Sequence, residues 1–301
     1  MVENIILTNK VTGVVLELDM VTTTYYILES VDWGQIGCTH HSYKYVNQIG
    51  NLVTGTTLEA REDIEIVGWV IAKTEEQMDQ RKQMLNGFVN PQWFIELKYK
   101  KYAIDFLPNT TIKYGTTMQE NNEIMCKFKI SGMAPDPLFK ETTERRVAAA
   151  ATKGMFHFPL CINAKEQKPP QIVFGLRQPS FIVNIYNKGS MATGMTIVFE
   201  AKSTVVNPSL MSVKTQKYFK INKTLTAGEK VTVNTLTGSR KITGFLNGVE
   251  LNYFKYRDLK NVWLQLEVGD NLFRYDADEN VDGLEVYIYF YDKYLEVQQC
   301  Y

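Results

Sequence analysis

The stretch NPSLMSVKTQKYFKINKTLTAGEKVTVNT, residues 207–235, decides how the rest of the chain is interpreted. It alternates short apolar and β-branched runs with turn residues such as Ala227-Gly228-Glu229, a pattern typical of short strands joined by tight turns. It holds no nucleophile beside a base, no metal-ligand spacing and no phosphate-binding loop. The stretch therefore predicts β structure and gives no sign of catalysis.

The same pattern extends through the second half of the chain. Asn247-Gly248 is a strong hairpin signal, and apolar residues alternate over Ser180–Tyr186 and Met195–Ala201. Further short strands are expected at Met155–Ile162, Gln171–Phe174, Lys230–Asn234, Arg240–Thr243, Val262–Leu266 and Leu284–Phe290. Many short strands at regular spacing predict a β-sandwich, not a parallel α/β sheet.

The first half is also predicted to be mainly β structure. Hairpins are expected at Ile5–Leu18 and at Ile95–Phe106, where Lys100-Lys101 forms the turn. Single strands are expected at Thr22–Leu28, Arg61–Ala72 and Ile124–Ile130. Residues 33–60 are rich in Gly, Thr, Asn and His, and they are predicted to form a long loop or an irregular ribbon.

One α-helix is predicted, at about residues 75–89. Thr74 is placed to cap it, and Gln77 stands three residues further on, as a capping box requires. An apolar stripe at helical spacing is formed by Met78, Leu85, Phe88 and Val89. Such a stripe predicts packing into a core, not a ligand site.

The chain is long enough for two domains. It has 301 residues, of which 45% are hydrophobic and 22% charged, so each half can bury a core. Pro135-Asp136-Pro137 breaks the chain, and a polar, then alanine-rich stretch follows. We therefore expect domains at residues 1–139 and 155–301, joined by a linker at 140–154. Within the linker, Thr142–Ala151 is expected to form either a short helix or a linker strand.

Composition argues against several classes of protein. Lys+Arg and Asp+Glu both number 33, and this zero net charge disfavours a general nucleic-acid or acidic-membrane binder. The N-terminal residues MVENIILTNK lack the apolar core of a signal peptide, and no run approaches the roughly 20 apolar residues of a membrane helix. A soluble protein that is not exported by the usual signal is expected. Widely spaced, reduced and mostly buried thiols rather than a zinc site are predicted for Cys38, Cys126, Cys161 and Cys300.

The histidines offer little chemistry. His40 and His41 are adjacent, and neighbouring side chains on a strand point to opposite faces, so they are not expected to bind one metal ion together. The only other histidine is His157, and Cys38 near His40 is too generic a pattern to indicate a catalytic pair.

The carboxylates, tryptophans and basic pairs are likewise interpreted as parts of the structure and not as functional sites. A late acidic cluster is predicted to be a polar loop, because the twelfth position counted from Asp276 is Tyr287 and not the glutamate of a calcium loop. This cluster comprises Asp270, Asp276, Asp278, Glu279 and Asp282. Buried core positions are expected for Trp33, Trp69, Trp93 and Trp263, although an exposed one could stack on a sugar. A solvated linker and a turn are expected for Arg145-Arg146 and Lys100-Lys101. No catalytic, cofactor-binding or metal-binding residue is predicted, and no cofactor.

Taken in order, the motifs resemble those of phage distal tail proteins, the siphovirus-type tail component family. In the first half the matching features are Gly55–Ala72, the helix at 75–89 followed by Asn90-Pro91, the hairpin Ile95–Phe106, and the strand ending in Ala134–Phe139. In the second half they are Asn207–Leu210, Ala227–Glu229, Asn234-Thr235, and Leu266 with Gly269–Asn271.

This resemblance implies a fold and a function. The first domain would be a tail-tube-like β-sandwich with one helix, and the second a galectin-like β-sandwich. Six copies would close into a ring that continues the tail tube and passes the tape-measure protein and then DNA, without sequence recognition. Partners would be the major tail tube protein, the tail-associated lysin or tail fibre, and receptor-binding proteins. The protein would be made in the bacterial host cytoplasm and reside at the virion tail tip, and it would not be an enzyme.

Two other functions remain open from the residues. One is a carbohydrate-binding module for bacterial surface glycans, which would use an exposed tryptophan. The other is a glycan or peptidoglycan hydrolase, which would use carboxylates between Asp270 and Asp282.

Overall fold

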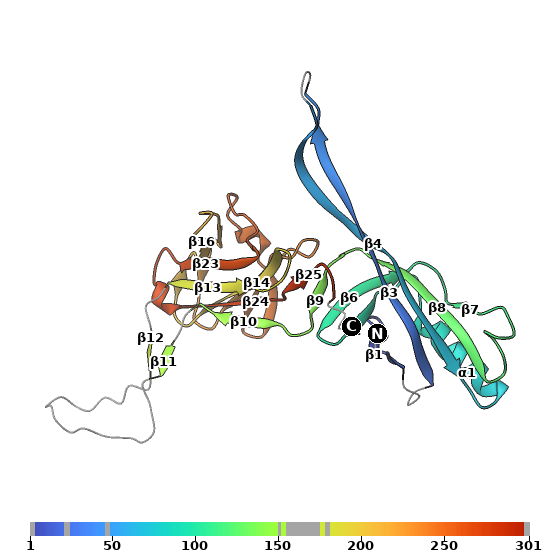
Figure 1. Cartoon of the computed structure of the whole chain (residues 1–301). Coiled ribbons are helices and arrows are strands. Elements are labelled where there is room, and N and C mark those ends of the chain that lie inside the picture. The colour runs from blue at the N-terminus through green and yellow to red at the C-terminus, as the bar shows by residue number, and fades with distance from the viewer. Residues whose placement is uncertain are drawn as a thin grey trace. The chain divides into compact units, whose positions relative to one another are not determined.

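The computed structural model describes residues 4–20, 25–45, 49–149, 152–154, 175–177 and 181–297 (Figure 1). The chain forms two compact units: unit 1 is Met1–Thr142 with Tyr294–Tyr301, and unit 2 is Thr143–Lys293. The chain therefore crosses between the units twice. The prediction of a mainly β protein is confirmed, and α1 is the one α-helix within the described ranges. None of the described helices is long and apolar enough to cross a membrane.

Unit 1 is built on one ten-stranded sheet and the helix. The sheet has the order β25-β9-β6-β5-β1-β2-β3-β4-β8-β7, and β6 also pairs with β8, so the sheet curls back on itself. The elements are β1 (Asn4–Asn9), β2 (Val15–Asp19), β3 (Tyr26–Tyr43), β4 (Leu52–Ile71), α1 (Glu75–Phe88), β5 (Ile95–Tyr99), β6 (Tyr102–Pro108), β7 (Lys113–Tyr114), β8 (Met125–Ala134), β9 (Phe139–Glu141) and β25 (Lys293–Tyr294).

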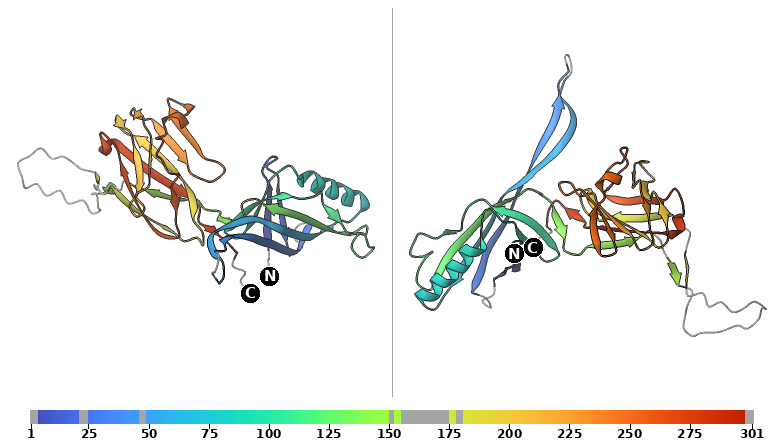
Figure 2. Two further views of the ribbon diagram at one scale, coloured as in Figure 1. Left: turned by 90° about the horizontal axis from the view of Figure 1, so that it is seen from above. Right: turned by 180° about the vertical axis from the view of Figure 1, so that it is seen from behind.

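The predicted helix is confirmed, and it covers one face of this sheet (Figure 2). Thr74 caps it by accepting a hydrogen bond from the backbone of Gln77, while the Gln77 side chain accepts from the backbone of Lys73 rather than from that of Thr74. The apolar stripe joins the unit 1 core, as expected. Burial of each such side chain contributes about 1.5–3 kcal/mol, which fixes the helix on the sheet.

Of the two alternatives predicted for residues 33–60, the irregular ribbon is confirmed and the long loop is wrong, because most of the described residues there belong to two long antiparallel strands, β3 and β4, whose pairing shifts register. Two of the glycines that suggested a loop lie at or beside shifts of register, Gly37 between Ile36 and Cys38, and Gly55 opposite His41. Gly34 has a φ of +71°, and an added Cβ there would clash with the carbonyl oxygen of Glu62. Glycine is thus required at an irregularity inside a strand, where it mimics the composition of a loop.

Unit 2 has two main sheets. The larger runs β10-β24-β14-β19-β20-β21, with β22 paired to β14, and the smaller runs β13-β23-β16-β17. The strands are β10 (Arg145–Ala148), β11 (Thr152–Gly154), β12 (Gly175–Arg177), β13 (Ile182–Asn187), β14 (Thr193–Ala201), β15 (Val205–Val206), β16 (Ser209–Ser212), β17 (Tyr218–Lys220), β18 (Thr224–Leu225), β19 (Lys230–Asn234), β20 (Lys241–Leu246), β21 (Val249–Asn252), β22 (Gln265–Leu266), β23 (Gly269–Asp276) and β24 (Leu284–Phe290). Two short 3₁₀ helices, η1 (Phe254–Tyr256) and η2 (Val281–Gly283), lie in its loops.

Both sheets contribute their alternate residues to one core. Phe199 and Val231 from the larger sheet and Phe273 and Leu210 from the smaller one are buried in a single cluster. This arrangement is that of a β-sandwich, as predicted. At Asn247-Gly248 both residues have positive φ, 51° and 83°, which is the type I′ hairpin turn that the sequence indicated.

Some expected elements have other limits. The expected domain limits, 139 and 155, do not coincide with those of the compact units, because β10 lies in the expected linker and pairs with β24 in unit 2. The alternative of a helix there is therefore wrong. The strand expected at Val262–Leu266 is reduced to β22. The strands expected at Met155–Ile162 and Gln171–Phe174 lie outside the described residues, as do His157, Cys161 and Cys300.

The stretch at 207–235 is organised by one buried carboxylate. Glu229 is fully buried and accepts hydrogen bonds from Lys223 Nζ (2.6 Å), the Thr226 backbone (3.0 Å) and Tyr253 Oη (2.8 Å). Burial opposes ionisation, but these donors outweigh it and hold the pKa of Glu229 below its usual range. Burial and the hydrogen bond to Glu229 raise the pKa of Tyr253 to about 12. The turn around Gly228 is thus stabilised by charge.

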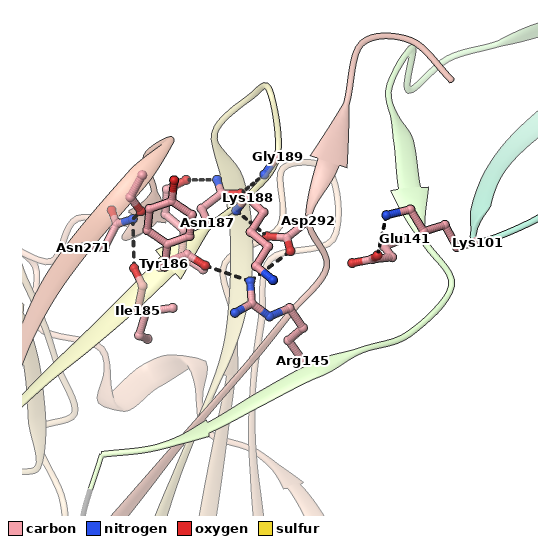
Figure 3. A network of polar contacts seen from close by, with 12 residues as sticks. Lys101, Glu141, Arg145, Ile185, Tyr186, Asn187, Lys188, Gly189, Asn271 and Asp292 are labelled. Atoms are coloured by element: carbon pink, nitrogen blue, oxygen red, sulfur yellow. Dashed lines mark hydrogen bonds and ion pairs between the residues drawn. The ribbon is translucent and has the colours of Figure 1, made fainter. Parts of the chain in front are cut away.

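A second buried carboxylate joins the two segments at which the chain enters and leaves unit 2 (Figure 3). Asp292 accepts from Arg145 Nη1 (2.9 Å) and from the backbone of Lys188 (3.1 Å). Arg145 also donates to the carbonyl oxygen of Tyr186 (2.7 Å). The expectation of a solvated Arg145 is therefore wrong, because its guanidinium neutralises a buried charge.

We expect Glu229→Gln to lower the free energy of unfolding of unit 2 by about 2–3 kcal/mol at pH 7, because it leaves Lys223 without its buried counter-charge. The folded-state pKa is depressed, so this stability is present above the carboxyl's unfolded pKa of about 4.3 and is lost as pH falls through the folded value. Urea unfolding of both proteins at pH 7 and at pH 3 measures the difference, which should shrink at pH 3.

Glu250→Gln is the matched control. Glu250 pairs with Lys241 at 2.9 Å, but both side chains are more than half exposed, so the change should stay within about 0.5 kcal/mol. Equal effects of the two substitutions at pH 7 would contradict the role given to Glu229.

Candidate assembly surface

The far part of the β3–β4 hairpin projects beyond the rest of unit 1 (Figures 1 and 2). We call residues 36–45 and 49–60 the distal arm. Pairing of β4 with β8 begins at Arg61, and β3 meets β2 only at Ile27. Within the described residues, the strands of the distal arm therefore pair with each other alone.

The distal arm has no core of its own. None of its described residues is buried, and large apolar side chains are exposed at Tyr43, Tyr45, Ile49, Leu52 and Val53. An isolated two-stranded hairpin is at best marginally stable in water. Both faces of the distal arm carry polar and apolar residues without a clear period of two, which is why the sequence left a loop and a ribbon open as alternatives.

Polar pairs across the strands support the distal arm instead. His40 Nδ1 lies 2.9 Å from Thr56 Oγ1, His41 Nε2 lies 3.1 Å from Thr57 Oγ1, and Thr39 donates to Glu59. His40 and His41 thus have separate partners across the hairpin, as expected for neighbours on a strand. The Cys38 sulfur lies 3.9 Å from His40 Nε2. These side chains make an exposed ladder of polar contacts along the distal arm.

The root of the distal arm is held by a buried arginine. Arg61 is 0% exposed, and its Nε donates to the carbonyl oxygen of Pro137 (3.0 Å). Its Nη1 donates to the carbonyl oxygens of Trp33 and Gly34, each at 3.2 Å. Its Nη2 donates to the carbonyl oxygen of Leu295 and to Glu296 Oε1.

The guanidinium of Arg61 also lies 4.7 Å from the centroid of the Phe139 ring, which packs edge-on against Trp33. One side chain therefore joins β3, β4, the segment before β9 and the returning C-terminal segment. The sequence showed Arg61-Glu62 only as the start of a strand, and burial of the arginine could not be read from it.

The acidic cluster does not converge on one point. Asp270 accepts from Asn184, Asp276 pairs with Arg274, and Asp278 pairs with Lys220. Among the residues that the structure describes, no group of three or more His, Cys, Asp or Glu side chains could hold a metal ion. Three carboxylates of the cluster thus make separate polar contacts, each with a different partner.

The tryptophans differ from one another. Trp33 occupies the core, as expected, but the expectation of core positions for Trp69, Trp93 and Trp263 is wrong, because all three are half-buried. Trp69 Nε1 donates to Glu29, which explains its place at the surface. Lys100-Lys101 forms the hairpin turn between β5 and β6, as predicted, with Lys100 at a φ of +51°.

Comparison with known proteins confirms the resemblance seen in the sequence. Residues 188–294 match the family described as siphovirus-type tail component, C-terminal domain. The fold of the chain is similar to that of SPP1 Dit (gp 19.1), described as a paradigm of the hub adsorption apparatus in phages that infect Gram-positive bacteria. That match has a TM-score of 0.62 at 14% identity, and covers 96% of this chain and 98% of the other.

A chain of the phage P2 baseplate in its activated conformation with Ca is similar as well, with a TM-score of 0.57 at 12% identity over 99% of this chain and 100% of the other. The P2 baseplate with Sr gives 0.53 at 12% identity, over 98% and 99%. No curated protein gives a significant match. The chain thus has a Dit-like, β-rich fold found in phage tail and baseplate proteins.

We expect Arg61→Met to lower the free energy of unfolding by about 3–5 kcal/mol. Methionine fills similar space, but it leaves the carbonyl groups of Trp33, Gly34 and Pro137 without a donor. Urea unfolding measures the loss. Arg274→Met is the control, because Arg274 is half exposed and its one ion pair with a described residue is to exposed Asp276, so less than about 0.5 kcal/mol is expected. Similar losses in both variants would rule out the role of Arg61.

Proposed function

We propose that this chain is a structural hub of a phage tail tip, which assembles as a hexameric ring. The ring joins the tail tube to the tail-associated lysin or tail fibre and supports host attachment. Two findings support this: the family match over residues 188–294, and the similar fold of a protein described as a hub adsorption apparatus. The same two findings support a role that is structural and not enzymatic.

The distal arm is the observation that carries the proposal of a ring. Its apolar side chains are exposed, and its strands pair with nothing else in the described part of the chain. A neighbouring copy that received the arm would present a different surface from the arm itself. Such a heterologous contact, repeated by rotation, closes into a ring.

The other proposed partners follow from the position of the ring between the tail tube and the tail fibre. The ring would stack on the major tail tube protein on one side and on the lysin or fibre on the other, with receptor-binding proteins at its periphery. Its channel would pass DNA without reading sequence, which is consistent with zero net charge. The protein would be made in the bacterial host cytoplasm and would act in the virion tail.

Mass and shape test the ring directly. Six chains of 34.6 kDa give roughly 210 kDa, with a central hole visible by electron microscopy. Light scattering over a range of concentrations should show this species. A monomer at every concentration, together with the absence of the protein from purified tails, would refute the proposal.

The distal arm can be tested by adding charge to it. Leu52→Asp with Val53→Asp should abolish the roughly 210 kDa species, because buried carboxylates at a subunit contact are costly, while the thermal unfolding midpoint of the monomer stays unchanged. Leu259→Asp, at a leucine of unit 2 that is 92% exposed, is the matched control and should leave the ring intact. A ring formed by the arm variant would exclude the arm from the contact.

A further inference from the structure

Positive charge is concentrated in one segment of unit 2. Residues 213–263 hold ten lysines and arginines and three acidic residues, a net charge of +7 in a chain whose total is zero. Four of these cations are paired: Lys220 with Asp278, Lys223 with Glu229, Lys230 with Glu200 and Lys241 with Glu250. The other six make no ion pair with the described residues, namely Lys214, Lys217, Arg240, Lys255, Arg257 and Lys260.

Four of the six gather around Trp263. The guanidinium carbons of Arg240 and Arg257 lie 5.4 and 5.7 Å from the centroid of its ring. Trp263 also lines a cleft of about 110 Å³, together with Lys214 and Lys217 from the turn between β16 and β17. We call Lys214, Lys217, Arg240 and Arg257 the basic surface.

The arginines of the basic surface are held by aromatic rings. Arg257 also lies 5.5 Å from the centroid of the Phe254 ring. An arginine fixed in this way loses little rotamer freedom when it binds, and its fork of donors matches the oxygen atoms of a phosphate. Neutral ligands would leave these charges unmatched.

The lining of the cleft is not uniformly basic. It also includes the carboxylates of Glu267 and Asp270, which accept hydrogen bonds and repel anions. A ligand that fits the whole lining presents phosphate groups to the cations and hydroxyl groups to the carboxylates. A uniformly anionic protein surface would offer negative charge to the cations but no hydroxyl groups to the carboxylates.

We propose that the basic surface and its cleft bind a polyol-phosphate chain, a polymer of hydroxyl-bearing units joined by phosphodiesters. Such a ligand would reach a tail tip at the bacterial surface, so the proposal rests on the proposed function. Single-stranded nucleic acid fits less well, since its bases need open aromatic faces. Although Trp263 is only half-buried, its ring already contacts Phe219, Arg240 and Arg257, so it is not an open face for a base.

Binding of the full chain to immobilised poly(glycerol phosphate) tests this. Lys214→Gln with Lys217→Gln removes two exposed charges of the turn and should weaken binding about tenfold or more, with a smaller salt dependence. Adding Arg240→Gln and Arg257→Gln should abolish it. The matched control is Lys230→Gln with Lys241→Gln, which removes two charges that are already paired, and it should bind like the unmodified chain.

Equal affinities of the two double variants would overturn the proposal. Tighter binding to a single-stranded oligonucleotide, or equal binding to a neutral glucan, would overturn the ligand class. Ring formation is measured on the same samples by light scattering. A chain that forms the ring but does not bind the polymer refutes only this inference, whereas a monomer that binds it refutes only the proposed hub.

Discussion

The buried guanidinium of Arg61 is the interaction on which the architecture of unit 1 depends. A buried charge is tolerated only where its donors are satisfied, and Arg61 has four backbone carbonyl groups and one carboxylate around it. These acceptors lie up to 235 residues from Arg61 along the chain. The root of the distal arm and the returning C-terminal segment are therefore fixed together, so the arm begins from a rigid base.

That rigid base gives the distal arm its proposed use. A two-stranded hairpin without a core would fray if both ends were free. Anchored at one end and supported by the histidine–threonine pairs, it remains extended and presents its apolar residues to a partner. In unit 2 the buried carboxylates of Glu229 and Asp292 act similarly, since each fixes a turn or a crossing segment by charge. Both units thus use a buried charge where the chain must hold an irregular shape.

Local signals in the sequence predicted the local elements. Thr74 and Gln77 marked the start of the helix, and Asn247-Gly248 marked a hairpin, because capping and turn chemistry act over a few residues. The distal arm was predicted only as one of two alternatives, a long loop or an irregular ribbon, because glycines at strand irregularities resemble those of a loop and neither face is buried in one copy of the chain. Arg61 was missed for another reason: its partners are distant in the chain, and sequence alone does not show which arginine the fold will bury.

The central claim is that the distal arm completes its packing only against another copy of the chain. Backbone amide hydrogen exchange, measured on the assembled protein and on the monomeric arm variant, tests it most directly. The account predicts that amides within residues 36–45 and 49–60 exchange slowly in the assembly and quickly in the monomer, while those of β14 and β24 in unit 2 exchange alike in both. Equally fast exchange of the arm amides in both states would contradict it.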